Sequence, residues 1–340
     1  MVSPAQQTLF LPFDNGILLP PVGETRFLAA GIEANTALGD VWKTALTCLQ
    51  PFRPDYLKLQ STGFHAVTRL DDHARFDGGL LLLGKHRGRN EEWFADLLSR
   101  VAPGGTIVVC GGKKLGIDSF RKWAGKTVAV EDRLSKNHAV VFWLTRPAEL
   151  TDEAIAALRP AAKHVNGQFH TAPGMFSHGE VDRASALLAG HLEGRLSGAV
   201  ADFGAGWGYL SAECLKYPQK IRKLDLYEAD FEAIEAARGN LSGFAGDVPL
   251  AFHWHDLVSE PVTEIYDTVV MNPPFHEGRA TDVSLGQAFI TAAARRLKTG
   301  GRLLLVANRQ LPYEATLKPL FRSVETLQET DGFKAIEAKK

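Results

Sequence analysis

Cysteine, long apolar runs and net charge are all scarce in this chain of 340 residues. Its three cysteines, Cys48, Cys110 and Cys214, are too few and too far apart to predict a disulfide framework or a thiolate metal site. No stretch approaches the run of about 18 apolar residues that a membrane-spanning helix needs. The amino terminus also lacks the basic start and apolar core of a secretion signal. We therefore expect a cytoplasmic protein with no membrane partner.

Charge and histidine spacing exclude two further classes of protein. The net charge of −1 argues against a protein that wraps naked nucleic acid by bulk electrostatics, so any such contact must use local basic patches. The eleven histidines include no pair with H-x-x-x-H spacing, and we expect no catalytic metal. The chain does contain 45% hydrophobic residues, which is enough for two cores, and its length predicts two domains.

A glycine-rich turn follows an apolar strand near residue 200. The predicted strand, residues 199–203, includes Asp202 and leads into Gly204, Gly206 and Gly208. Glycines at these positions let a ligand approach main-chain atoms that a Cβ would block. A dinucleotide fingerprint would need another glycine at position 209, where this chain has tyrosine. The pattern therefore indicates a nucleotide-binding loop and argues against an NAD-linked oxidoreductase.

Acidic residues end the next two predicted strands. Glu228 lies 22 residues after Gly206, where a carboxylate can accept both hydroxyl groups of an adenosine ribose. Asp256 follows the strand predicted over residues 249–254 and can accept the adenine amino group. Solvated acids at strand ends are the alternative for both residues. The order of strand, loop, helix and acid favours the nucleotide site, because parallel strands place these groups on one edge of a sheet.

The run Asn272-Pro273-Pro274-Phe275 follows a further apolar strand. The two prolines fix φ and remove two backbone donors, which leaves oxygens free to accept hydrogen bonds from a ligand. We assign the acceptors to the Asn272 side-chain oxygen and the Pro273 carbonyl, and the stacking surface for a base to Phe275. Taken alone, the run could be an ordinary turn. Beside the glycine loop, it predicts a site that binds an exocyclic amino group.

With these motifs the sequence resembles the class I S-adenosylmethionine-dependent methyltransferases that modify exocyclic amines. Four segments are similar to bacterial ribosomal RNA guanine-N2 methyltransferases that act on the small subunit. They are residues 272–278, Gly300-Gly301, residues 306–313 and Pro173 to Ser177. The resemblance implies two tandem Rossmann-like α/β domains, of which only the second is active. It implies S-adenosylmethionine as cofactor, with Phe176 bordering its methionine end and Asp202 and Asp182 near its amino group. It also implies ribosomal RNA or the small ribosomal subunit as partner.

An internal repeat supports this duplication. Residues 75–84 parallel residues 265–272, Gly104-Gly105 parallels Gly300-Gly301, and residues 138–144 match residues 333–338. In the first half, we place the counterpart of Asn272 to Phe275 at Gly84 to Arg87. Near the first strand of that half, a lone glycine, Gly31, stands in place of the glycine-rich loop. We predict a degenerate domain over residues 1–150 that supports the fold and contacts RNA, a linker over 151–172, and a catalytic domain over 173–340.

A basic rim on the degenerate domain is the predicted RNA contact. Its residues lie at neighbouring strand ends and suit phosphate groups: Lys85, Arg87, Arg89, Lys113 and Lys114. Three alternatives to the small-subunit guanine stay open, namely a large-subunit guanine, an adenine N6 and a protein glutamine. A different class is an inactive RNA-binding protein of ribosome assembly. We expect the chain to act as a monomer.

Overall fold

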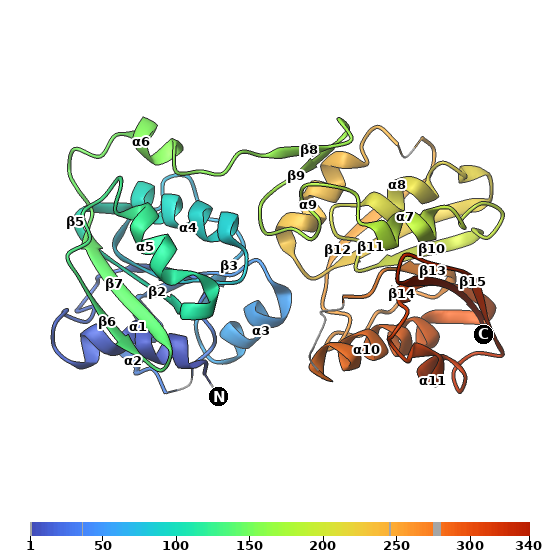
Figure 1. Cartoon of the computed structure of the whole chain (residues 1–340), viewed down its shortest axis with the longest axis horizontal. Coiled ribbons are helices and arrows are strands. Elements are labelled where there is room, and N and C mark those ends of the chain that lie inside the picture. Colours follow the sequence, from blue (N-terminus) through green and yellow to red (C-terminus); the bar gives the residue numbers. More distant parts are fainter. Residues whose placement is uncertain (1, 36, 245, 275–279) are drawn as a thin grey trace. The chain divides into compact units, whose positions relative to one another are not determined.

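The computed structural model describes residues 2–35, 37–244, 246–274 and 280–340, with backbone alone for 280–282. The chain divides into two compact units, Met1–Ala161 and Ala162–Lys340 (Figure 1). Within the described residues, each unit is built on a seven-stranded sheet. This arrangement confirms the α/β class that the sequence predicted.

The first unit has the sheet order β3-β2-β1-β4-β5-β7-β6. Its strands are parallel up to β5, and β7 and β6 complete the sheet in antiparallel pairing. Its elements are α1 (Pro4–Asp14), β1 (Phe27–Ala30), α2 (Asp40–Ala45), β2 (Leu46–Leu49), α3 (Arg53–Ser61), β3 (His65–Val67), β4 (Phe76–Leu82), α4 (Arg87–Arg100), β5 (Val101–Gly112), η1 (Lys113–Leu115), α5 (Ile117–Ala124), β6 (Asp132–Lys136), β7 (Ala139–Thr145) and α6 (Asp152–Ala156).

The second unit repeats this design with the order β12-β11-β10-β13-β14-β16-β15, preceded by a two-stranded hairpin. Again only the last two strands are antiparallel to their neighbours. Its elements are β8 (Lys163–Val165), β9 (Phe169–Thr171), α7 (Arg183–Ala189), β10 (Gly198–Phe203), α8 (Tyr209–Cys214), η2 (Pro218–Lys220), β11 (Ile221–Glu228), α9 (Phe231–Asn240), β12 (Leu250–Trp254), β13 (Tyr266–Met271), α10 (Ala280–Arg296), β14 (Leu297–Asn308), α11 (Tyr313–Leu317), β15 (Ser323–Thr330) and β16 (Phe333–Lys339).

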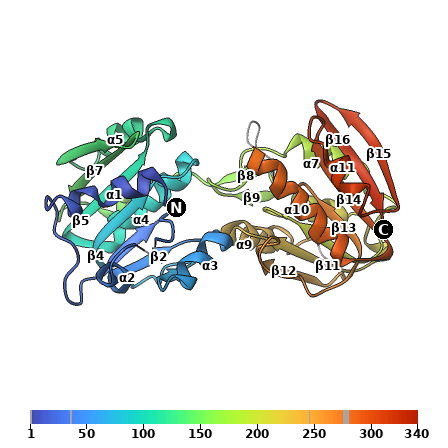
Figure 2. The same ribbon diagram turned by 90° about the horizontal axis from the view of Figure 1, so that it is seen from below.

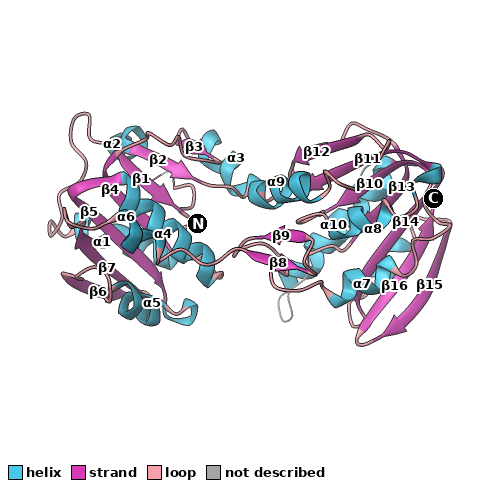
Figure 3. Ribbon diagram, turned by 90° about the horizontal axis from the view of Figure 1, so that it is seen from above, coloured by secondary structure: helices cyan, strands magenta, loops and turns pink. Residues whose placement is uncertain are grey.

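Helices cover both faces of the second sheet. Figure 3 shows α7, α8 and α9 over one face, and Figure 2 shows α10 and α11 over the other. Buried side chains alternate along the central strands, so that Val200 packs under the first group of helices and Ala201 under the second. A parallel sheet that is buried on both faces binds its ligands at the edge formed by the carboxyl ends of its strands.

The two sheets match residue by residue at their centres. β4 and β13 have a register shift at the same place, between Phe76 and Gly78 and between Tyr266 and Thr268. Counting from this shift makes Leu82 the structural counterpart of Asn272. The sequence had placed that counterpart at Gly84. The difference arises because Pro273 has no N–H and β13 ends at Met271, whereas the first unit continues its pairing with a bond from Leu83 N to Cys110 O of 2.8 Å.

Residues 151–172, predicted as a linker, contain regular structure. Thr151 caps α6 by accepting a hydrogen bond from Ala154 N at 3.2 Å. The chain then passes into the hairpin of β8 and β9, which belongs to the second unit. The division between the units therefore lies after Ala161.

Candidate functional site

A pocket in the second unit lies at the carboxyl ends of β10 and β13. Its lining brings together residues from three distant parts of the sequence: Phe176, Asp182, Ser185, Gly204, Gly206 and Asn272. Three of the motifs found in the sequence thus meet in one place: the segment around Phe176, the glycine loop and the run that begins at Asn272. The ends of adjacent parallel strands place the glycine loop beside the asparagine.

The glycine loop exposes its backbone to this pocket. Gly204 and Gly206 both have positive φ, 79° and 54°, which a residue with a side chain rarely adopts. A Cβ added to Gly206 would meet nothing within 4 Å, whereas one on Gly204 would lie 3.2 Å from the Phe289 ring and 4.0 Å from the Asn272 carbonyl. The space in front of Gly206 is therefore open. Gly208 differs, because a Cβ there would meet Ala237 of α9 at 3.1 Å, and its role in this structure is helix packing.

Glu228 ends β11 and is tied to the glycine loop. Its Oε2 accepts a hydrogen bond from Gly206 N at 2.8 Å, and its Oε1 accepts one from Asp230 N at 2.9 Å. Burial raises the pKa of this carboxyl, and the two backbone donors oppose that rise. Each carboxylate oxygen has a second lone pair, so the group can still accept a ligand hydroxyl.

Asp256 lies one strand further along the same edge, after β12. Its carboxylate is engaged in its own turn, with Oδ1 accepting from Val258 N at 3.0 Å and Oδ2 accepting from Ser259 Oγ at 2.5 Å. The residue is buried and does not belong to the lining of the pocket. The structure thus gives Asp256 a role in holding the loop that follows β12.

Asp202 is fully buried at the end of β10. Its Oδ2 accepts a hydrogen bond from Ser211 Oγ at 2.7 Å, and its Oδ1 has no partner among the described residues. Burial raises the pKa of Asp202 to about 7, against the lowering effect of the bond from Ser211. A carboxyl with this pKa changes its charge near neutral pH.

Asn272 has a fixed side chain with one unused oxygen. Its Nδ2 donates to Asp182 Oδ2 at 2.8 Å and to Ser185 Oγ at 2.9 Å. Its Oδ1 is buried and has no hydrogen-bond partner in the part of the chain that the structure describes. Such an atom is costly to leave unsatisfied, which points to a ligand donor as its partner. Pro273 is buried and Pro274 exposed, while Phe275 lies outside the described residues.

Asp182 has a second function as the N-cap of α7. Its Oδ2 also accepts from Ser185 N at 2.8 Å, so the helix start fixes the carboxylate that holds Asn272. Sequence reasoning placed Asp182 at the cofactor and missed Ser185. The pattern of an N-cap acid followed three residues later by a polar side chain was the available signal.

Two further residues missed by the sequence hold the pocket wall. Trp207 Nε1 donates to the Phe176 carbonyl at 2.9 Å, which fastens the segment around Phe176 to the glycine loop. Asn240 of α9 donates to the Trp207 carbonyl at 2.9 Å and to the His170 carbonyl at 3.0 Å. The Phe176 ring itself is 57% exposed. No local pattern in the sequence marks Asn240, because its partners come from distant elements.

The first unit lacks the chemical groups of this pocket at the matching positions. Gly31 keeps the positive φ of Gly204, at 72°. In Gln50, Oε1 accepts from Phe52 N at 3.1 Å, which reproduces the bond between Glu228 and Asp230. The remaining counterparts are apolar or too large for a ligand to approach the backbone: Ala29 for Asp202, Glu33 for Gly206 and Leu82 for Asn272.

The matching space in the first unit is filled by its own amino-terminal residues. Ser3 N donates to Glu33 Oε2 at 2.8 Å, and Gln6 Nε2 donates to the Glu33 carbonyl at 2.6 Å. Gln6 lies on α1 and is fully buried. These contacts occupy the end of β1 where the second unit presents Gly206.

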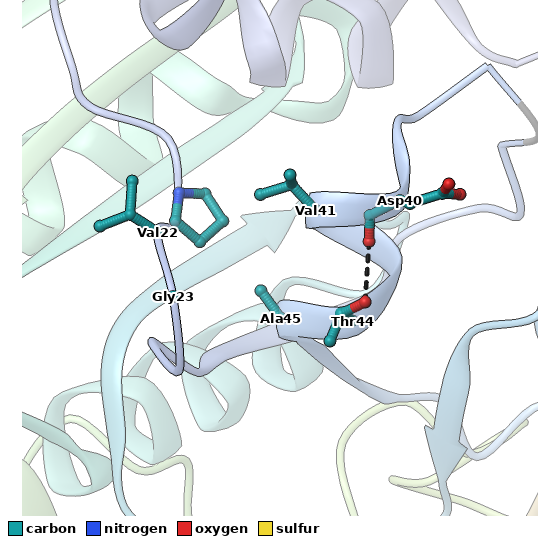
Figure 4. Close-up of a pocket in the computed structure, with 7 residues that line it drawn as sticks. Val22, Gly23, Asp40, Val41, Thr44 and Ala45 are labelled. Atoms are coloured by element: carbon teal, nitrogen blue, oxygen red, sulfur yellow. Dashed lines mark hydrogen bonds between the residues drawn. The ribbon is translucent and has the colours of Figure 1, made fainter.

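A separate hollow in the first unit lies at the opposite edge of its sheet. It is lined by Val22 and Gly23, which precede β1, and by Asp40, Val41 and Thr44 of α2, which precedes β2 (Figure 4). Its visible hydrogen bond is internal to α2, from Thr44 Oγ1 to Asp40 O at 2.9 Å. Its position at the amino ends of the strands separates it from the edge where parallel sheets bind ligands.

The basic residues predicted to contact RNA divide into two groups. Lys85, Lys113 and Lys114 are exposed after the carboxyl ends of β4 and β5. Arg87 forms an ion pair with Glu91 at 2.6 Å and lies over the Phe120 ring at 4.8 Å. Arg89 is buried, with 9% of its surface exposed, because α4 turns it toward the protein, so it cannot contribute to a surface rim.

Two features are absent from the described part of the chain. No helix there combines the length and apolar character that crossing a membrane requires. The same residues contain no cluster of three or more His, Cys, Asp or Glu side chains placed to hold a metal ion.

Comparison with known proteins agrees with the fold and identifies the family. Residues 166–337 match the model of the Methyltransferase small domain. Ribosomal RNA small subunit methyltransferase C of Psychromonas ingrahamii is 30% identical over 289 residues, covering 82% of this chain and 80% of that protein. The protein of the same name from Pseudomonas aeruginosa strain UCBPP-PA14 is 33% identical, covering 80% of this chain and 84% of that protein.

A solved structure resembles the chain over nearly its full length. The T. thermophilus 16S rRNA N2 G1207 methyltransferase in complex with AdoMet and guanosine has a TM-score of 0.77 and 24% identity, covering 99% of this chain and 92% of that chain. This likeness shows that both units have the Rossmann-like methyltransferase fold. Together with the sequence relatives, it establishes that the chain belongs to the ribosomal RNA small subunit methyltransferase C family.

Proposed function

We propose that this enzyme transfers a methyl group from S-adenosylmethionine to the exocyclic N2 amine of a guanine in small-subunit ribosomal RNA. The observation that supports this function most strongly is the buried, unpartnered Oδ1 of Asn272 in a pocket shared with the glycine loop. An acceptor held in that place suits a donor amino group. The named activity of the family relatives favours ribosomal RNA as the molecule that carries it.

The second unit fits the cofactor along one sheet edge. Gly204 and Gly206 would admit the methionine portion, Glu228 would accept the ribose hydroxyls, and Asp256 would lie on the adenine side. Asn272, the glycine loop, Glu228 and Asp256 follow four adjacent strands, β13, β10, β11 and β12. Three strand spacings of about 4.8 Å place these groups along roughly 14 Å, which suits an elongated ligand. Phe176 would border the methionine end of the cofactor. Asp202 would stabilise the glycine loop from its buried position at the end of β10.

Residues of the chain align the amino group and accept hydrogen bonds from its N–H groups. S-adenosylmethionine supplies a methyl group on a positively charged sulfur, an activated donor. The guanine amine is a weak nucleophile because its lone pair is delocalised into the ring. Asn272 Oδ1 and the Pro273 carbonyl accept hydrogen bonds from its two N–H groups, which directs the nitrogen lone pair toward the methyl group and stabilises the positive charge that develops on nitrogen. As the N–C bond forms, the C–S bond of the donor breaks, and the nitrogen then releases one proton to water. The proposal gives Pro274 the role of fixing the turn, and gives Phe275, which lies outside the described residues, the role of stacking on the base.

The first unit contributes substrate binding and support to the second. Its exposed lysines, Lys85, Lys113 and Lys114, would contact RNA phosphates, while its filled ligand space leaves catalysis to the second unit. We propose that the chain acts as a monomer. We place this activity in the cytoplasm, where bacterial ribosomes are assembled.

Methyl transfer followed by nucleoside analysis tests this function. The full chain is incubated with methyl-labelled S-adenosylmethionine and small ribosomal subunits that lack the modification, and the RNA is digested to nucleosides. We expect the label in N2-methylguanosine. Label in another nucleoside, in protein, or nowhere would contradict the proposal.

The Asn272→Ala variant gives this assay its internal control. Because Asn272 contacts the acceptor base, the substitution should abolish transfer, by at least 100-fold in kcat, the scale measured for loss of a transition-state hydrogen bond. Cofactor affinity, measured by calorimetry, should stay within about twofold of the wild type. Near wild-type turnover would remove Asn272 from the mechanism.

A further inference from the structure

We infer that Asp182 is a positioning residue that locks the amide of Asn272 in one orientation, so that position 272 acts only as an acceptor. This inference rests on the proposed function and adds to it a determinant of amine recognition outside the sequence motif. Ser185 assists, since both residues accept from Asn272 Nδ2, at 2.8 Å and 2.9 Å. Asp182 lies 90 residues before Asn272 in the chain.

The chemistry of Asp182 determines which end of the amide faces it. An ionised carboxylate has acceptors only, so the atom 2.8 Å from its Oδ2 must be the amide nitrogen. A half-turn of the amide would bring Asn272 Oδ1 against the carboxylate, with two acceptors in contact and no proton between them. The hydroxyl of Ser185 could rotate and donate to the flipped amide, but Asp182 could not. The block on the flip therefore comes from Asp182.

The carboxylate is itself held in place. Its Oδ2 accepts from Ser185 N at 2.8 Å as the N-cap of α7, and α7 packs on the sheet through buried Ala184 and Leu188. A single oxygen of Asp182 thus fixes the Asn272 side chain relative to α7. Both N–H groups of Asn272 Nδ2 are used in these bonds. The amide oxygen Oδ1 is buried and has no partner among the described residues.

This arrangement gives the site its preference for an amino group. An asparagine free to rotate could donate to a carbonyl or ring nitrogen as easily as it accepts from an amine. The locked amide can only accept, which favours a base edge that carries NH2 and disfavours one that carries oxygen. It also keeps the acceptor in place before the base arrives, so no reorganisation is needed during the reaction.

Replacing the two side chains singly and together tests the inference. Asp182→Ser keeps a good N-cap for α7, but its hydroxyl can donate to the Asn272 amide as well as accept from it, so either orientation of the amide is allowed. Asn272→Asp places two carboxylates in contact. The double variant, Asp182→Ser with Asn272→Asp, restores one donor facing one acceptor and leaves a carboxylate oxygen for the amine. Thr151→Ala, which removes the N-cap of α6, controls for loss of a helix cap.

Kinetics and cofactor binding are measured for all four variants and the wild type. We expect Asp182→Ser to lower kcat at least tenfold while the Kd for S-adenosylmethionine and the Tm change little. Asn272→Asp should be the least active, and the double variant should exceed it at least tenfold. Thr151→Ala should match the wild-type kcat. The kcat values of the variants are compared with that of the wild type on whichever base the wild type methylates. A failure of the proposed substrate would therefore appear in the wild type itself and would not change the order of the variants.

Two results would overturn the inference. One is an Asp182→Ser variant with kcat within twofold of the wild type. The other is a double variant no more active than Asn272→Asp. If Asp182→Ser loses its fold, Asp182→Thr supplies another N-cap hydroxyl with the same freedom to donate or accept, and the same two results apply to it.

Discussion

Glu228 connects the glycine loop to β11 through a single side chain. Its two oxygens accept from Gly206 N and Asp230 N, and each has a lone pair left for a ribose hydroxyl. Glu228→Ala should therefore weaken cofactor binding at least tenfold in calorimetry, by loosening the loop and by removing the ligand acceptor. Gln50→Ala removes the matching side chain of the first unit and should leave the affinity unchanged. Equal affinities for all three proteins would place the ribose contact elsewhere.

Asp202 should make stability depend on pH. Its folded pKa, raised by burial to about 7, exceeds the ordinary value of 3.8. The folded protein therefore holds a proton that the unfolded chain releases, so stability is highest below about pH 4 for this group and declines as the pH rises to about 7. Asp202→Asn removes the titration with little change in shape.

Urea unfolding at pH 5, 6, 7 and 8 measures this effect. The free energy of unfolding of the wild type, relative to Asp202→Asn, should fall across the series and level off above pH 7. A difference that stays constant with pH would show that Asp202 does not titrate in this window.

At the scale of elements, helix α10 is packed closely against α11. A Cβ added to Gly286 of α10 would overlap the Tyr313 hydroxyl and ring, and Tyr313 is fully buried. Gly286→Ala should lower the free energy of unfolding by about 1–3 kcal/mol, the usual effect of overpacking. Gly239→Ala in α9 is the matched control, since a Cβ there meets nothing within 4 Å. The control should be neutral or more stable by up to about 1 kcal/mol because alanine favours helix.

Thermal and urea unfolding of both variants check this contrast. If Gly286→Ala were as stable as Gly239→Ala, the two helices would not approach each other as closely as the structure shows.

Most elements of the second unit could be predicted from periodicity and motif order. The strand before Asn272, the acid at the end of β11 and the glycine loop all lie where local sequence patterns placed them. Contacts between distant elements could not be predicted in this way. The bonds from Asn272 to Asp182 and Ser185, the tie from Asn240 to Trp207, and the burial of Arg89 depend on how helices pack on the sheet. The first unit also continues its pairing through Leu82 and Leu83 N, past the level at which β13 ends, so the counterpart of Asn272 is Leu82 and not Gly84.

For the whole molecule, the duplication predicts one cofactor site per chain. Ala29, Glu33 and Leu82 replace the groups of the pocket in the first unit, and Gln6 fills the matching space. Calorimetric titration of the full chain with S-adenosylmethionine should give a stoichiometry of one. A value near two would mean that the first unit binds the cofactor after all.

The first unit should instead affect RNA binding. Lys113→Ser with Lys114→Ser removes two exposed charges at the carboxyl end of β5, and should raise the KM for ribosomal subunits several-fold with less dependence on salt. Lys122→Ser with Lys126→Ser makes the same charge change at and beyond the end of α5 and serves as the control. Equal KM values for the two double variants would exclude this rim from RNA contact.

The most direct test of the whole account is the structure of the protein bound to S-adenosylhomocysteine and guanosine. The decisive measurement is the distance from the guanine N2 to Asn272 Oδ1. We predict a hydrogen bond of about 2.7–3.2 Å, with Asn272 Nδ2 still on Asp182. A guanine whose N2 faces away from Asn272, or an amide rotated to donate to the base, would contradict the mechanism.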